Sequence, residues 1–162
     1  MEIIWRPIED KDEKIINSWL DNDAKKMLCM ENVSWQQTAR DIGECLSIMN
    51  NAQFRNAIGY VDGEPVCALM FGVEFSGKIL RLYNILVAPK HRNKGVAKSA
   101  VEDILSNENK FELNKTYDKI VFSILPENKI SEKLAKTFNF KFDGENDIYL
   151  DFSCDLNKEL TK

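Results

Sequence analysis

One short stretch of this sequence combines positive charge with a glycine in a way that suits phosphate binding. Residues 88–98 contain one histidine, no acid and four permanent cations, which are Lys90, Arg92, Lys94 and Lys98. Gly95 would let the backbone approach a ligand closely, and the first amides of a helix after it would be unpaired donors. A solvated basic loop is the alternative. The stretch follows an apolar strand, so we favour the phosphate site, although it is not a P-loop.

The elements around this stretch predict a mixed sheet. Periodicity and turn residues predict strands at 2–6, 54–61, 65–74, 79–87, 119–125, 140–142 and 148–152, and helices at 10–28, 34–49, 95–106 and 128–138. A strand–helix–strand crossover makes the strands at 79–87 and 119–125 parallel neighbours. Ligands of such sheets bind beyond the carboxyl ends of the parallel strands. These ends lie just after Val87 and Leu125.

The same residues carry a family resemblance. Val87-x-Pro89 followed by the run 92–97 (RNKGVA) resembles the R-x-x-G-x-G/A acetyl-CoA signature of the GNAT N-acetyltransferase superfamily. Asn128, and Asn139-Phe140 where the family usually has Gly-Phe, resemble its second conserved block. The predicted element order is also the family's. The resemblance therefore implies a single-domain α/β GNAT-like fold. Its sheet would be mixed and mostly antiparallel, with one central parallel pair splayed around the cofactor and helices on both faces.

The resemblance also implies how acetyl-CoA, the expected co-substrate, would be held. Backbone groups of the strand end at 85–87 would pair with the pantetheine arm. The amides of residues 92–97, assisted by Arg92 and Lys98, would hold the pyrophosphate. Asn128 would bond to the pantetheine or lie near its sulfur, and it could also cap the next helix. The implied cofactor residues are Ile85, Leu86, Val87, Arg92, Asn93, Lys94, Gly95, Val96, Ala97, Lys98 and Asn128.

The catalytic groups are less evident from the sequence. The family often has a tyrosine seven residues after the conserved asparagine, but this position is Ala135. Ser131 could replace it as a proton donor or water holder, or could simply satisfy local backbone. No glutamate occupies the strand before the basic stretch, where Asn84 could polarise a water or the substrate, or be an ordinary strand residue. Glu74 and Glu127 stand at strand ends, where most acids are solvated.

The charge of the chain limits its partners. Lys plus Arg is 22 and Asp plus Glu is 26, a net charge of −4, so we expect no nucleic-acid partner. Residues 1–31 contain five cations and eight acids, which are Glu2, Glu9, Asp10, Asp12, Glu13, Asp21, Asp23 and Glu31. An acidic rim made by these residues would favour a cationic amine such as a polyamine or an aminoglycoside. A solvated helix face explains the same acids.

Two functions from different classes remain open. The first is an acetyl-CoA-dependent N-acetyltransferase that moves an acetyl group directly to a primary amine of a small molecule or protein. The alternative is a catalytically weak CoA-binding sensor or assembly module of the same fold, which would account for the missing tyrosine and base. We favour the enzyme, because positioning alone can supply about 7–11 kcal/mol of catalysis.

The chain length of 162 residues suits one domain, which we expect at 1–154, with a frayed tail at 155–162. No apolar run reaches about 18 residues and the start has no signal-peptide pattern, so we expect a cytoplasmic protein without a membrane partner. It could be a monomer or a homodimer. A single histidine and four scattered cysteines predict no metal site and reduced, mostly buried thiols.

Overall fold

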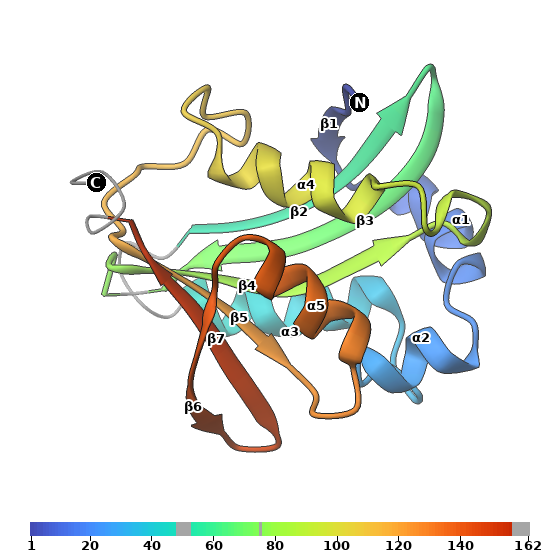
Figure 1. Cartoon of the computed structure of the whole chain (residues 1–162). Helices are drawn as coiled ribbons and strands as arrows, with labels where there is room; N and C mark the ends of the chain where they lie inside the picture. Colours follow the sequence, from blue (N-terminus) through green and yellow to red (C-terminus); the bar gives the residue numbers. More distant parts are fainter. Residues whose placement is uncertain (48–52, 75, 157–162) are drawn as a thin grey trace.

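The computed structural model describes residues 1–47, 53–74 and 76–156 of the chain (Figure 1). Its strands are β1 Ile4–Pro7, β2 Gln53–Val61, β3 Glu64–Val73, β4 Ile79–Val87, β5 Lys119–Ile124, β6 Lys141–Asn146 and β7 Tyr149–Asp155. Its helices are α1 Glu13–Ser18, α2 Asn22–Met27, α3 Trp35–Ser47, α4 Val96–Leu105 and α5 Lys129–Thr137, with 3₁₀ turns η1 Asp10–Asp12 and η2 Pro89–His91. None of these helices is long and apolar enough to cross a membrane.

The strands form one sheet in the order β1-β2-β3-β4-β5-β7-β6. β4 and β5 are parallel, and the other neighbouring pairs are antiparallel. The crossover through α4 produces the parallel pair, because a strand that returns after a helix re-enters the sheet in the same direction. The predicted mixed sheet with one central parallel pair is confirmed.

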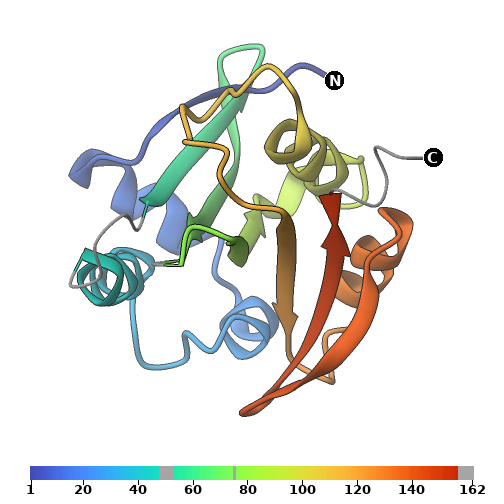
Figure 2. The same cartoon turned by 90° about the vertical axis from the view of Figure 1, so that its left-hand side faces the viewer.

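Helices cover both faces of the sheet, as predicted (Figure 2). α4 and α5 pack on one face, where the buried cluster includes Phe71, Leu80 and Ile104. α1 and α3 pack on the other, where the cluster includes Ile16 and Trp35. The central strand β3 supplies side chains to both clusters, and this explains why its sequence is almost continuously apolar.

A bulge in β4 and the end of its pairing with β5 open the sheet at one end. Met70 of β3 pairs with Asn84 and Phe71 with Leu82, so Tyr83 is an extra residue. The pairing of β4 with β5 covers only Ile79–Leu82, and among the described residues no strand pairs with the rest of β4 on that side. The parallel pair is therefore splayed at its carboxyl end, as the family resemblance implied.

The single helix predicted over residues 10–28 is wrong, because η1, α1 and α2 divide it. At Asp21 the backbone is extended (φ −70°, ψ 174°), and the Asp21 carboxylate accepts a hydrogen bond of 2.8 Å from the Ala24 amide as the N-cap of α2. The apolar residues before the break, Ile16, Trp19 and Leu20, are buried, and those after it, such as Met27, are partly buried. The cap at Asp21 outweighs the helical periodicity, which continues through the break.

Other expectations meet mixed outcomes. Asn139, just after α5, has a φ of 62°, the left-handed conformation in which asparagine often ends a helix. Helical periodicity in α5 would place Ile130 inward with Leu134 and Phe138, but Ile130 is 83% exposed. All four cysteines are thiols, but two of them are exposed, so the prediction of mostly buried thiols is only half right. The described residues do not include Met49, the last residue of the helix predicted at 34–49, or residues 157–162 of the expected tail.

Candidate active site

A groove runs between α2, the end of β4, the start of α4 and α5, and we call it the α5 groove. Its volume is about 640 Å³. Ten of the eleven residues implied for acetyl-CoA line it, and only the exposed Lys94 does not. The sequence did not predict the walls supplied by Met27 of α2, by Leu28 after it, and by Ile130, Lys133, Leu134 and Thr137 of α5.

The start of α4 gives this groove an anion-binding end. Gly95 is the N-cap of α4 and has a φ of 82°, a conformation that favours glycine. An added Cβ at Gly95 would meet no atom within 4 Å, so the backbone there is open to a ligand. The amides of the first turn of α4, from Val96 to Lys98, have no partners within the helix. They lie at its positive end and suit a phosphate.

The family resemblance implied that the side chain of Arg92 assists in holding the pyrophosphate, but in this structure the side chain is hydrogen-bonded within the protein. Its Nη1 donates to Asp21 Oδ2 at 2.5 Å, its Nη2 to the Trp19 carbonyl at 3.0 Å, and its Nε to the Val87 carbonyl at 3.2 Å. Asp21 also caps α2, and both the cap and Arg92 lower the pKa of this carboxyl. The Arg92 guanidinium therefore ties α2 to the phosphate-binding end of the groove.

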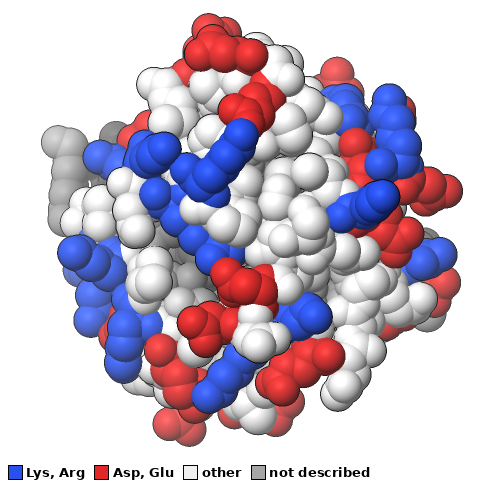
Figure 3. Space-filling view, turned by 90° about the vertical axis from the view of Figure 1, so that its right-hand side faces the viewer, with Lys and Arg blue, Asp and Glu red and all other residues white. Residues whose placement is uncertain are grey.

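Charge of both signs surrounds this groove. Figure 3 shows Lys and Arg side chains along the upper edge of a recess on this face, and Asp and Glu side chains below it. The lining residues include Arg92, Lys98 and Lys133 on one hand, and Asp21 and Asp23 on the other. The Arg92–Asp21 pair neutralises one charge of each sign, so the lysines supply the free positive charge of the lining.

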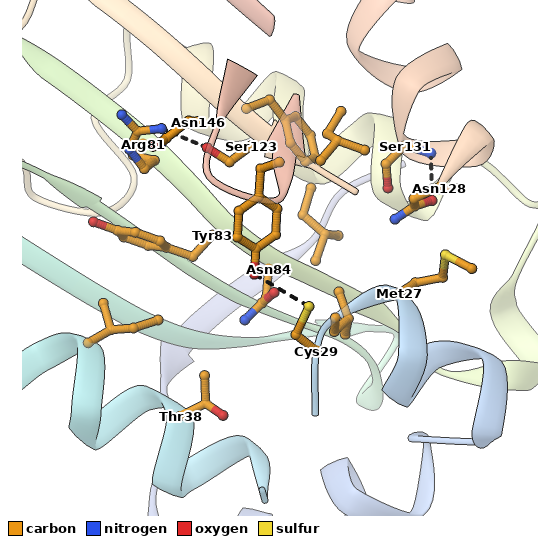
Figure 4. A pocket seen from close by; sticks show the side chains of 16 residues that line it. Met27, Cys29, Thr38, Arg81, Tyr83, Asn84, Ser123, Asn128, Ser131 and Asn146 are labelled. Atoms are coloured by element: carbon orange, nitrogen blue, oxygen red, sulfur yellow. Dashed lines mark hydrogen bonds between the residues drawn. The ribbon is translucent and has the colours of Figure 1, made fainter. Parts of the chain in front are cut away.

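A second cavity lies on the α3 face of the opened sheet, and we call it the sheet cavity (Figure 4). Its volume is about 340 Å³. Strands β4, β5 and β7, helix α3 and the end of α2 supply its walls. The lining is formed by Met27, Leu28, Cys29, Thr38, Ile42, Arg81, Tyr83, Asn84, Ile85, Phe122, Ser123, Ile124, Asn128, Ser131, Asn146 and Tyr149. These residues include no carboxylate and no histidine.

The groove and the cavity meet at the splay between β4 and β5. Five residues line both, and they are Met27, Leu28, Ile85, Asn128 and Ser131. Asn128 Oδ1 accepts a hydrogen bond from the Ser131 amide at 3.2 Å, which is the N-cap of α5. Figure 4 shows the amide nitrogen of Asn128 directed away from the helix. The capping role therefore leaves this donor available at the junction.

A charged cluster formed by Glu74 just after β3, Arg81 of β4 and Asp151 of β7 supports the far end of the sheet cavity. Arg81 Nε donates to Glu74 at 2.6 Å, and Arg81 Nη1 donates to Ser123 at 2.6 Å and lies 3.3 Å from Asp151. Burial alone would lower the pKa of Arg81, but the hydrogen bond to Glu74 and the two carboxylate charges raise it. Glu74 is therefore occupied by Arg81 and does not line the cavity as a free base.

Two tyrosines, Tyr83 of β4 and Tyr149 of β7, also line the sheet cavity, and neither is at position 135, where the family resemblance implied a tyrosine. Burial raises the pKa of Tyr83 and of Tyr149 to about 12. The Tyr149 hydroxyl donates to Cys29 Sγ at 3.4 Å, a bond that Figure 4 shows as the dashed line ending on Cys29. No local motif marks Tyr149, because only the β5–β7 pairing brings this C-terminal residue to the site.

Comparison with known proteins agrees with this geometry. A model of the acetyltransferase (GNAT) family matches residues 16–140, which is most of the chain. This protein belongs to the GNAT acetyltransferase family. No curated protein sequence matches it significantly.

Solved GNAT acetyltransferase structures share the fold at low sequence identity. An aminoglycoside acetyltransferase in complex with coenzyme A superposes with a TM-score of 0.75 at 13% identity, with 99% of each chain covered. An acetyltransferase from Thermus thermophilus gives 0.72 at 15% identity, covering 96% of this chain and 98% of the other. An N-acetyltransferase from Staphylococcus aureus gives 0.62 at 19%, covering 96% and 99%.

Against the GNAT pattern, this chain differs at the position of the expected acid. Ala135 is buried on α5 and has no hydroxyl. Ser131 lies at the junction of the two spaces, and Asn84 lies in the sheet cavity with its Nδ2 3.7 Å from Met70 Sδ. Within the described residues, no three His, Cys, Asp or Glu side chains are grouped to hold a metal ion.

Proposed function

We propose that this GNAT protein transfers the acetyl group of acetyl-CoA directly to a primary amine of a small molecule or protein. The observation that carries the proposal is the junction of two spaces at the β4–β5 splay. The α5 groove, with its anion-binding end, suits the cofactor, and the sheet cavity on the other side suits the acceptor. Asn128 and Ser131 would then lie where the two substrates meet.

The residues at the junction can supply most of what acetyl transfer needs. A main-chain amide of β4 in the segment 85–87 would stabilise the oxyanion, a role that requires no special side chain. Asn128 would hold the pantetheine end through its free amide nitrogen. We retain Ser131 as a proposed water holder or proton relay and Asn84 as a group that orients the acceptor. Lys98 would add charge near the pyrophosphate.

The residues that line the sheet cavity favour one kind of amine acceptor. None of the eight acids of residues 1–31 lines it, and several are paired elsewhere, as Asp12 is with Arg6. A polycationic acceptor would gain little from such walls, since focusing of a cation requires carboxylates. The proposal therefore favours an acceptor with a single amine on an otherwise neutral body, and the acidic rim is not part of it.

The amine is expected to lose its proton without a dedicated protein base. At pH 7 an alkyl amine of pKa about 10.4 is neutral once in about 2,500 molecules, a cost of roughly 4.6 kcal/mol. The described walls of the sheet cavity hold no carboxylate or histidine to recover this cost. The value of kcat/KM should therefore rise with pH until it follows the pKa of the amine itself.

The check is a pH–rate series with two good acceptors whose pKa values differ by about 2 units. The inflection should move down with the acceptor of lower pKa by the same difference. A protein base would instead fix the inflection between about pH 6 and 8 for both amines. Glu74, released from Arg81 during turnover, would then be the first carboxylate to replace.

A further inference from the structure

Tyr149 lines the sheet cavity and stands on β7 at the end of the sheet where β5 stops. Leu150 of β7 pairs with Ile124, the last residue of β5, so Tyr149 stands beside the point where β5 ends and the chain turns toward Asn128. Tyr149 lies two residues before Asp151, which contacts Arg81, and so both side chains lie on the α3 face. Its hydroxyl thus reaches the sheet cavity from the strand opposite β4.

We propose that Tyr149 donates a hydrogen bond to the sulfur of coenzyme A as the acetyl group leaves. This role rests on the proposed function. It gives Tyr149 of β7 the hydrogen bond to sulfur that α5 cannot supply at position 135, because Ala135 has no hydroxyl. The present partner of the hydroxyl is itself a sulfur atom, Cys29 Sγ, at 3.4 Å. An incoming sulfur with developing negative charge is a stronger acceptor than a neutral thiol, so the exchange of partners is favourable.

The hydroxyl keeps its proton over the pH range in which the reaction runs. Burial, with a smaller effect of Cys29 and of the Asp147 charge, raises the pKa of Tyr149 to about 12. The neutral phenol is therefore present wherever an alkyl amine becomes nucleophilic. Because an ordinary thiol has a pKa near 8.5, this phenol acts as a hydrogen-bond donor to the thiolate and need not transfer its proton.

The step balances without a further reactant. The amine nitrogen forms a bond to the carbonyl carbon, and the bond from this carbon to sulfur breaks. Its electron pair goes to sulfur, where the Tyr149 hydroxyl stabilises the new thiolate. The proton lost by the nitrogen passes to solvent, and a proton from solvent completes the thiol.

Figure 4 shows Tyr83 directed away from Asn128 and Ser131, so Tyr83 is not placed to donate to the sulfur.

The first test is Tyr149→Phe, which removes the hydroxyl and keeps the ring. With a small amine acceptor, kcat should fall about a hundredfold, while the dissociation constant of acetyl-CoA stays within about twofold. Tyr117→Phe is the matched control, because Tyr117 is buried in the cluster under α4 and α5, and it should keep the wild-type kcat. Unchanged kcat in a folded Tyr149→Phe protein overturns the proposal. So does an equal loss in Cys29→Ala, which would show that the bond only ties β7 to the segment after α2.

The second test needs no turnover and uses coenzyme A as the probe. A donor to sulfur favours the thiolate, so coenzyme A should bind more tightly relative to acetyl-CoA as the pH rises from 7.5 to 9.5. In Tyr149→Phe the increase with pH of the affinity for coenzyme A relative to acetyl-CoA should be several-fold smaller. The comparison is repeated in Cys29→Ala, because the Cys29 thiol contacts Tyr149. A ratio unchanged by Tyr149→Phe contradicts the proposal. Failure of the wild type to bind either molecule would contradict the proposed function instead.

Discussion

Gly95→Asp is expected to weaken acetyl-CoA binding by about a hundredfold or more. Two effects act together at this position. The φ of 82° is strained for any residue with a Cβ, at about 1–2 kcal/mol, and the new carboxylate would face the same amides that a phosphate needs. Each 1.4 kcal/mol lost is a factor of ten in affinity. Calorimetry with acetyl-CoA measures the effect directly.

Two variants separate charge from backbone strain. Gly95→Ala carries the strain without the charge and should lose only part of the affinity. Gly63→Asp is the matched control, because Gly63 has a φ of 78° in the β2–β3 turn and an added Cβ there also meets nothing within 4 Å. It should cost stability but leave acetyl-CoA affinity unchanged. If folded Gly95→Asp binds as tightly as the wild type, the phosphate site is not at this loop.

Arg81→Met is expected to lower the free energy of unfolding by about 3 kcal/mol, since removal of one partner of a largely buried ion pair leaves uncompensated charge. Glu74 and Asp151 would both lose their cation, and the exposed fractions of these side chains are only 24% and 16%. The far end of the sheet cavity would also lose the group that joins β4 to β7. Urea denaturation followed by circular dichroism gives the magnitude.

The control restores neutrality around the same cavity. Combining Arg81→Met with Glu74→Gln and Asp151→Asn removes the unpaired charges and should recover most of the lost stability. An Arg81→Met protein within about 0.5 kcal/mol of the wild type would place the cluster among weak surface ion pairs. The support assigned to the sheet cavity would then be absent.

The sequence allowed the sheet and the groove to be predicted because both depend on local signals. Hairpin turns, such as the one at Asp62-Gly63, join β2 to β3 and β3 to β4, and the one crossover makes β4 and β5 parallel neighbours. The anion-binding end follows from Gly95 and its cations at a strand-to-helix junction. Ten of the eleven implied cofactor residues line the α5 groove for this reason.

Other features of the fold and the site depend on contacts between distant segments, and no local sequence pattern reveals these contacts. The break before α2 is set by a cap at Asp21 and by Arg92, which is 71 residues away. The Tyr149–Cys29 bond joins residues 120 positions apart. Alternation from Leu80 and Leu82 would put Asn84 on the α4 face of the sheet, but the bulge at Tyr83 breaks the alternation, and Asn84 lines the sheet cavity.

The most direct test of the central account is acetyl transfer itself. The purified protein is incubated with acetyl-CoA and a panel of primary amines, and both free coenzyme A and the acetylated amine are quantified by mass spectrometry. We expect at least one amine, with a single positive charge on a neutral body, to yield the two products in equal amounts, at a rate that Gly95→Asp lowers strongly when acetyl-CoA is subsaturating. Tight binding of acetyl-CoA with no amine-dependent release of coenzyme A across the panel would contradict the account, and would show a CoA-binding module in place of an enzyme.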